Sequence, residues 1–469
     1  MIDDRVTGHK WWAGSGRPLG SMLTLNHMEQ PTREGLVRTI RRWDLVALVA
    51  NGIVGAGIFG LPSEVFSRVG VYSLLAFLVC AVAVTLIILC FAEVSSRFTE
   101  TGGPYLYARE AFGPVVGFQV GWMMWIARLT AFAANCNLLV AYFSFFVPSA
   151  GSDTGRAVTI SLVVIALTAV NVVGVRDATN VGNVLMVTKL TPLVLFVVVG
   201  CFFVEAERFS LAARPALGDF STSVLLLVYA FTGFEMATIP GGELRDARRD
   251  LPRALLTAIA LVTVLYVSIQ AVAIGTLPEL ASAARPLADA GGRFFGPWGA
   301  AVIAAGAVVS ILGNLNVTLL VAPRLLFAMA KRRELPGFIA ATHHRFHTPH
   351  VASVMTAALV LILTLSGTFV YAATISVLAR LLTYAATCVA LPTLRRAGAA
   401  PPARFVVPAG VAVSVVSLLL VAWLLFNSTG HQARDAGIAA ALGILINGAS
   451  RISQKFASTF PIVHHRDRA

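Results

Sequence analysis

Charged side chains are scarce in this sequence of 469 residues. Asp, Glu, Lys and Arg together make up 13% of the chain, whereas hydrophobic residues make up 57% and the mean hydropathy is +0.79. A typical soluble globular domain has about 25% charged residues. The composition therefore excludes such a domain and indicates an integral membrane protein.

Cysteine is also rare, and the motifs of ATP-driven and catalytic proteins are missing. The five cysteines lie within apolar runs with no pair at metal-ligand spacing, which indicates small core residues rather than disulfides or a metal site: Cys80, Cys90, Cys136, Cys201 and Cys388. The sequence contains no Gly-x-x-x-x-Gly-Lys motif and no nucleophile constellation, which disfavours an ATP-driven pump and a membrane enzyme. We expect no metal ion and no cofactor.

Acidic residues are outnumbered by basic ones, and the formal net charge is +13. No basic run is interleaved with aromatic residues, as a base-stacking surface requires, so we expect no nucleic-acid partner. Residues 1–42 are mostly polar and basic without the hydrophobic core of a signal peptide. They are predicted to form a cytoplasmic tail.

Long apolar stretches dominate the rest of the chain. Those of about 20 residues predict transmembrane helices near 43–66, 72–96, 114–147, 157–174, 181–203, 221–240, 254–277, 298–328, 351–368, 370–392, 405–426 and 435–449. With the amino terminus inside, the inner loops and tails carry most of the Lys and Arg residues. This pattern predicts a multi-pass protein of the cytoplasmic (inner) membrane with both termini in the cytoplasm.

Glycines are concentrated in the middle of the first predicted span, at Gly52, Gly55, Gly57 and Gly60. Each glycine in a helix interior costs about 1 kcal/mol relative to alanine. In lipid, an opened backbone is tolerated only around a protected cavity, so the cluster predicts a broken helix beside a binding site. The alternative is that Gly52, Ala56 and Gly60 form a face of small residues for close helix packing.

A second interrupted segment, residues 225–239, contains Phe231-Thr232-Gly233-Phe234-Glu235. Paired broken spans in corresponding positions of two halves are typical of a transporter site. Helix ends at such breaks offer N–H groups to a carboxylate and carbonyls to a cation, which together suit a zwitterion. The spacing predicts two inverted five-helix units in residues 43–395, two further helices in 396–450, and a cytoplasmic tail in 451–469.

Several motifs resemble those of one transporter superfamily. Residues 55–59, Gly-Ala-Gly-Ile-Phe, resemble the Gly-x-Gly-Ile-Phe signature of the amino acid-polyamine-organocation (APC) superfamily. Further segments are also similar to that family: residues 91–98, 101–105, 231–235, 242–244, 249–254 and 323–330. The last two spans match by hydropathy alone. The resemblance implies a leucine-transporter-type fold that carries amino acids or related amines, polyamines included, by alternating access.

The resemblance also implies the substrate contacts. The carboxylate is expected at the backbone N–H groups of Gly55, Ala56 and Gly57. The ammonium is expected at carbonyls near Ile53, Tyr229, Ala230 and Thr232. The family match places the Tyr229 ring where it can close over the substrate, whereas spacing alone leaves a core or lipid-facing position open.

Two ionisable residues in the predicted spans are candidates for coupling and gating. Lys189 resembles the lysine that replaces sodium in the proton-dependent branch of the superfamily, and burial of its ammonium favours proton release. Glu235, in the second break, either protonates and reorganises the break during transport or pairs with an intramembrane cation. A static structural cation is the alternative for Lys189.

Further polar residues at membrane depth are expected to face the protein interior. Arg128 and Arg380 stay charged, so they suit pairing between helices or binding of an acidic substrate better than proton transfer. Asn314 and Thr318 lie one helical turn apart and either line the cavity or form hydrogen bonds between helices.

The sequence therefore predicts an all-α, twelve-span APC permease in the lipid bilayer that imports an amino acid or related amine together with a proton. It is predicted to be no enzyme and to act as a monomer or homodimer. Obligate exchange of two amino acids or amines is the alternative mechanism. A receptor that senses an amino acid without moving it, or a channel, is the alternative class.

Overall fold

The computed structural model describes residues 42–99, 102–173, 178–210, 214–238, 247–346, 348–396 and 401–459. These residues form helices and no strands. The predicted tail 1–42 lies outside the described residues except for Arg42, and so do residues 460–469 of the predicted C-terminal tail.

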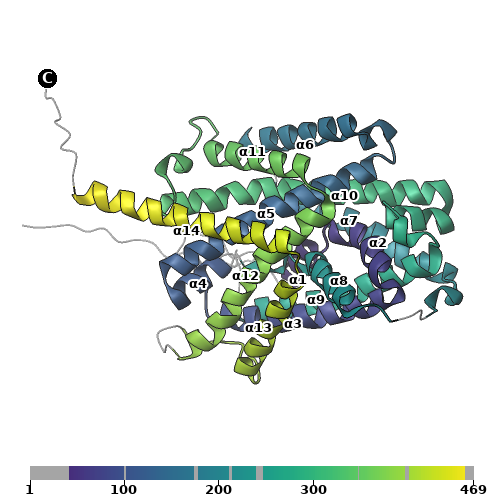
Figure 1. The fold of residues 1–469 in the computed structure, drawn as a ribbon, viewed down its shortest axis with the longest axis horizontal. Coiled ribbons are helices and arrows are strands. Elements are labelled where there is room, and N and C mark those ends of the chain that lie inside the picture. Colours follow the sequence, from purple (N-terminus) through teal and green to yellow (C-terminus); the bar gives the residue numbers. More distant parts are fainter. Residues whose placement is uncertain are drawn as a thin grey trace, which may run out of the picture.

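The α-helices follow one another along the chain (Figure 1). They are α1 (Arg42–Ile53), α2 (Gly57–Val69), α3 (Ser73–Ser95), α4 (Pro104–Phe112), α5 (Pro114–Phe143), α6 (Asp153–Val173), α7 (Ala178–Gly200), α8 (Leu217–Phe231), α9 (Ala247–Thr276), α10 (Pro286–Lys331), α11 (His350–Ser366), α12 (Phe369–Arg396), α13 (Gly410–Phe426) and α14 (Gly430–Thr459). A 3-10 helix, η5 (Phe234–Thr238), follows α8.

Each predicted apolar stretch coincides with a helix or with a pair of helices. Six helices of the described chain are long and apolar enough to cross a membrane, or up to seven if the bent pair α13 and α14 counts as one span. The number is smaller than twelve for two reasons. Helix α2 counts together with α3 as one stretch, Gly57–Ser95, and the apolar segments Lys189–Phe203, Leu217–Phe231 and His350–Ser366 are shorter than 18 residues. The structure therefore supports an all-helical membrane protein.

The interrupted helices lie inside the bundle. Helix α5 packs against α10 and α12, while α1 and α3 both pack against α9, and α8 packs against α2 and α3. In Figure 1, α6 and α11 run side by side along one edge, whereas α3 and α13 lie at the opposite edge. The segments around α1 and α8 are thereby enclosed by neighbouring helices.

Helix α10 begins earlier than the predicted span at 298–328 and contains a kink. The kink is at Gly296, whose φ of 67° is a conformation that favours glycine, and Pro297 follows it. The part of α10 after this kink coincides with the predicted span and carries the residues that reach the cavity.

Two details differ from the sequence predictions. Cys80, Cys90, Cys136 and Cys388 are buried as expected, but Cys201 is exposed, because it follows the end of α7 on an outer face of the bundle. Helix α14 continues to Thr459, beyond the predicted boundary of the last helical unit at residue 450.

Candidate functional site

The first predicted break is present between α1 and α2. Helix α1 ends at Ile53 and α2 begins at Gly57, so residues 54–56 connect two half-helices. Val54 still donates its N–H to the Ala50 carbonyl over 2.8 Å. Among the described residues, no backbone carbonyl accepts from the N–H groups of the three predicted carboxylate ligands, Gly55, Ala56 and Gly57. The break therefore exposes the type of donor that the glycine cluster predicts.

The second predicted break separates α8 from η5. Helix α8 ends at Phe231, Thr232 is extended, and Gly233 has a φ of 108°. A Cβ atom on Gly233 would also collide with the carbonyl oxygen of Gly52 in α1. Only glycine satisfies both the backbone conformation and this close approach.

The two breaks contact each other directly. A Cβ atom on Gly57 would lie 2.8 Å from the Cα atom of Ala230, and one on Gly52 would lie 3.0 Å from the Gly233 carbonyl oxygen. Gly60, in contrast, faces Phe369 and Leu138. Gly52 and Gly60 therefore face different elements, and they do not form one packing face against a single helix.

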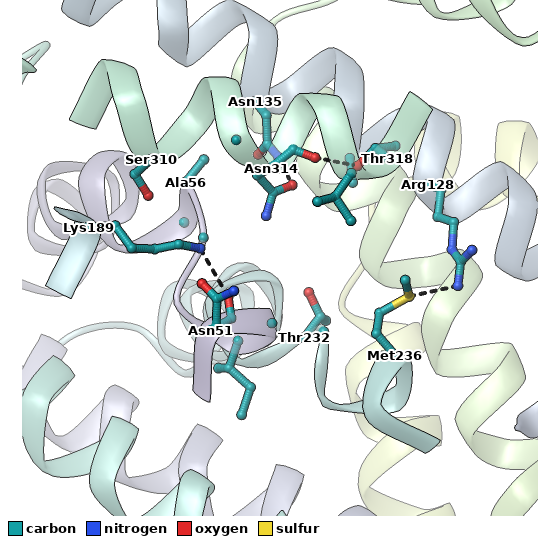
Figure 2. A pocket seen from close by; sticks show the side chains of 18 of the residues that line it. Asn51, Ala56, Arg128, Asn135, Lys189, Thr232, Met236, Ser310, Asn314 and Thr318 are labelled. Carbon is teal, nitrogen blue, oxygen red and sulfur yellow. Dashed lines mark hydrogen bonds between the residues drawn. The ribbon is translucent and has the colours of Figure 1, made fainter. Parts of the chain in front are cut away.

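A cavity of about 370 Å³ lies beside the two breaks (Figure 2). This volume is in the range of small-molecule sites, which is about 300 to 1,000 Å³. Most of the residues predicted from the sequence line it: Ile53, Gly55, Ala56, Gly57, Arg128, Lys189, Tyr229, Thr232, Asn314, Thr318 and Arg380. Ala230 and Glu235 are not among its lining residues. Ala230 packs against Gly57, and Glu235 borders a separate small space of about 10 Å³.

Lys189 extends from α7 to the end of the first half-helix. Its Nζ atom donates to the carbonyls of Asn51 over 3.1 Å and Val54 over 2.9 Å. Ser310 of α10 lies on the same side of the cavity, and its buried Oγ atom has no hydrogen-bond partner (Figure 2). The ammonium is thus held at the carbonyl end of α1, which the helix dipole makes favourable for a cation.

An amide network joins the second break to α5 and α10. The Tyr229 hydroxyl donates to Asn135 Oδ1, and Asn135 Nδ2 donates to Asn314 Oδ1 over 3.0 Å. Thr318 Oγ1 donates to the Asn314 carbonyl over 2.9 Å. The Tyr229 ring packs edge-to-face against Phe369, with centroids 6.1 Å apart. This network fixes the orientation of Tyr229 at the cavity wall.

The carbonyls predicted to hold an ammonium already have partners in the protein. The Tyr266 hydroxyl lies 3.2 Å from the Ile53 carbonyl and 3.3 Å from the Ala230 carbonyl, and it also interacts with the Gly55 backbone. The Tyr229 carbonyl accepts from Thr232 Oγ1 over 2.8 Å. The Tyr229 carbonyl also accepts from the Thr232 N–H over 3.4 Å. Since a carbonyl has two lone pairs, the Ile53 and Ala230 carbonyls can still accept from a second donor.

Glu235 is paired inside the protein. Its carboxylate accepts from Arg380 Nε over 3.1 Å, from the Tyr384 hydroxyl over 2.9 Å and from the Gly233 N–H over 2.9 Å. Its side chain is 6% exposed. The sequence left Arg128 and Arg380 as possible partners of Glu235, and in the structure the partner is Arg380. Through these bonds the carboxylate also links the Gly233 turn to α12.

Arg128 has different surroundings from Arg380. It is 6% exposed and lines the cavity, and its Nη2 atom donates to the thioether of Met236 over 2.7 Å (Figure 2). Within the described ranges, it forms no salt bridge with a carboxylate. The two intramembrane arginines therefore have separate environments.

Four lining residues with polar or sulfur-containing side chains were not predicted from the sequence: Asn51, Asn135, Met236 and Ser310. Asn135 carries the same signal that singled out Asn314, a polar side chain inside an apolar span, and could have been found by it. Asn51 directly precedes the glycine cluster, and its buried Oδ1 atom has no hydrogen-bond partner. Met236 and Ser310 give no distinctive signal, because methionine and serine are common within membrane helices.

Comparison with known proteins supports the motif-based resemblance. The family model described as "Amino acid permease" matches residues 40–447. The methylthioribose transporter of Bacillus subtilis is 26% identical over 436 residues, which cover 89% of this chain and 94% of that protein. The serine/threonine exchanger SteT of the same organism is 29% identical over 345 residues, or 71% of this chain and 77% of the exchanger.

A third relative is the arginine/ornithine antiporter of Pseudomonas aeruginosa, which is 30% identical over 315 residues, or 64% of this chain and 65% of the antiporter. All three relatives are transporters by name. With the family match extending over both breaks and the cavity between them, the chain belongs to the amino acid permease family of the APC superfamily.

Proposed function

We propose that this protein is a secondary active transporter that imports an amino acid or related amine across the cytoplasmic membrane by alternating access, together with a proton. The observation that carries the proposal is the contact between two broken helices beside one cavity, where Gly52 and Gly57 lie against Gly233 and Ala230. Unpaired backbone groups at membrane depth are costly unless they serve a protected site. Family membership supports amino acid transport in particular.

For the fold, we propose twelve spans arranged as two inverted five-helix units followed by two helices. In this arrangement α1 with α2 forms the first broken span, and α8 with η5 begins the second. Helices α11 and α13, at 17 residues each, are just long enough to span a typical hydrocarbon core. The excess of Lys and Arg in alternate loops supports a cytoplasmic location for both termini.

The proposed substrate site uses backbone groups at both breaks. The N–H groups of residues 55–57 would bind the carboxylate, since they have no backbone acceptor and lie at the start of α2, although the Gly55 backbone also contacts the Tyr266 hydroxyl. The ammonium would bind at the carbonyl ends of α1 and α8, near Ile53 and Thr232, with the unpaired Asn51 Oδ1 atom beside them. Tyr229 would close over the bound substrate.

We propose Lys189 as the residue that carries the coupling proton. Its ammonium donates hydrogen bonds to the Asn51 and Val54 carbonyls, so loss of the proton would weaken the hydrogen bonds that join α7 to the end of α1. Release of α1 would then permit the break to rearrange between outward and inward states. Glu235 is the less favoured carrier, because its carboxylate is already stabilised by Arg380, Tyr384 and the Gly233 N–H.

Exchange of two substrates is a second candidate mechanism. Two relatives bear the names of a serine/threonine exchanger and an arginine/ornithine antiporter. An exchanger also needs a cavity that closes over a substrate, and it differs from a symporter in that the empty protein does not change state. The same site thus serves either mechanism.

Uptake by the purified protein in proteoliposomes distinguishes these mechanisms. Labelled amino acids are supplied with a pH gradient, a sodium gradient, or unlabelled amino acid inside the vesicles, each imposed separately. Proton coupling requires uptake that responds to the pH gradient alone, whereas exchange requires internal amino acid and no gradient. Absence of amino acid movement under all three conditions would refute the proposed function.

A further inference from the structure

The charged side chains around the cavity are unequally paired. Arg128, Lys189 and Arg380 line the cavity, and Glu235 lies behind it next to Arg380. Lys189 donates to two carbonyls of the first break, and Arg380 is bonded to Glu235 over 3.1 Å. Arg128 differs from the other two cations. Within the described parts of the chain, it has no hydrogen bond to a carboxylate or a carbonyl.

The hydrogen bonding of Arg128 is far from saturated. A guanidinium has five N–H donors, and the thioether sulfur of Met236 that accepts one of them is a weak acceptor. Glu235 attracts Arg128 and Arg380 repels it, but both oxygens of Glu235 already accept hydrogen bonds from Arg380, Tyr384 and Gly233. A buried cation in this position is costly unless an anion joins it.

We propose that the transported substrate carries an anionic group in addition to its α-carboxylate, and that Arg128 binds this second group. The inference rests on the proposed transport function and names the substrate class, an acidic amino acid such as aspartate or glutamate. A carboxylate matches the planar fork of arginine and accepts two parallel hydrogen bonds from it.

The layout of the cavity suits a substrate with an acid at each end. In Figure 2, Ala56 and Arg128 lie on opposite sides of the cavity, with Thr232, Asn314 and Thr318 between them. The α-carboxylate would bind near Ala56, and the acidic side group would reach Arg128. Hydroxyl and amide groups between the two ends are suited to a polar substrate.

The charge of the site disfavours amines with an additional cation. Three cations and one carboxylate surround the cavity, so polyamines and basic amino acids would enter a site of the same sign. The substrate class inferred here thus differs from that in the name of the arginine/ornithine antiporter. Neutral amino acids would leave the Arg128 guanidinium unpaired.

Paired ligands of the same shape provide the test. Binding of L-glutamate is compared with that of L-glutamine, and L-aspartate with L-asparagine, to the purified full-length protein, with L-leucine and L-arginine as further ligands. We expect each acid to bind about 10- to 100-fold more tightly than its amide, the value of a charge-assisted hydrogen bond. In the Arg128→Gln variant, the ratio of the affinity for each acid to that for its amide should fall toward one. The Arg128→Lys variant should retain part of the preference for acids.

Arg324→Gln is the matched control, because Arg324 is an exposed arginine of α10 outside the cavity. It should leave the preference for acids unchanged. Equal binding of acids and amides by the wild-type protein would overturn the inference. A preference for acids that is unchanged in the Arg128→Gln variant would also overturn it. Uptake of leucine or arginine without a preference for acids would overturn it while leaving the transport function intact. If no amino acid binds or moves, the proposed function itself fails.

Discussion

Replacement of Gly57 by alanine tests whether the contact between the two breaks is essential. The added Cβ atom would lie 2.8 Å from the Cα atom of Ala230, 3.1 Å from its Cβ atom and 3.2 Å from its backbone nitrogen. Two of these three atoms belong to the backbone of α8, so no side-chain rotation can relieve the overlap. The substitution must therefore move α2 and α8 apart.

The expected cost follows from comparison with an unhindered glycine. Overpacking by one methyl-sized group typically costs about 1 to 3 kcal/mol. Gly437 lies inside α14, and a Cβ atom there would meet no atom within 4 Å. Gly437→Ala should stabilise its helix by about 0.5 to 1 kcal/mol. The two variants, with the same chemical change, should therefore differ by about 1.5 to 4 kcal/mol.

Unfolding of the detergent-purified proteins and substrate uptake in proteoliposomes would measure the effect. Gly57→Ala should unfold at a lower temperature than the wild-type protein and take up substrate more slowly, whereas Gly437→Ala should match or exceed the wild-type stability. Addition of Ala230→Gly removes the 3.1 Å overlap but leaves the other two, so it should rescue Gly57→Ala in part. If Gly57→Ala retains full stability and full uptake, the breaks are not packed against each other as described.

Three further predictions concern the polar contacts of the site. Asn135→Leu should slow uptake more than it lowers the unfolding temperature, because the variant removes the side-chain acceptor of the Tyr229 hydroxyl and leaves it the Ala131 carbonyl at 3.2 Å; equal effects on both measurements would contradict a role in positioning. Glu235→Gln should cost about 3 to 5 kcal/mol in unfolding experiments, since Arg380 stays buried without its partner. A second change, Arg380→Met, should recover part of that loss, and strict additivity would argue against the pair. Lys189→Met should abolish the response of uptake to an imposed pH gradient, and a preserved response would exclude Lys189 as the proton carrier.

The breaks could be predicted from sequence because their cause is local. Glycine clusters weaken helices wherever they occur. Gly52, Gly55, Gly57, Gly60 and Gly233 lie inside apolar stretches that would otherwise predict continuous helices. Eleven of the thirteen candidate residues, which came partly from the family resemblance and partly from their polarity at membrane depth, lie at the wall of one cavity. The two exceptions, Ala230 and Glu235, lie directly behind that wall, because their side chains point away from it toward neighbouring helices.

The partners of buried charges could not be predicted, because they depend on long-range packing. Glu235 and Arg380 are 145 residues apart, and the sequence offered Arg128 as an equal candidate for the pair. Spans that are apolar on all sides also give no periodicity that marks their inner face, so Ser310 was missed. The substrate contacts and the membrane topology remain predictions, and the binding and uptake experiments above address the substrate contacts.

The position of Tyr266 has a consequence for how a ligand enters. Its hydroxyl lies within reach of two carbonyls, one at the end of each broken helix, at 3.2 Å from Ile53 and 3.3 Å from Ala230. A hydroxyl has a single hydrogen, so it can satisfy only one of these carbonyls at a time. In the proposed site, an arriving amine would therefore find one of these two carbonyls without a hydrogen bond from Tyr266 and would not have to displace the tyrosine.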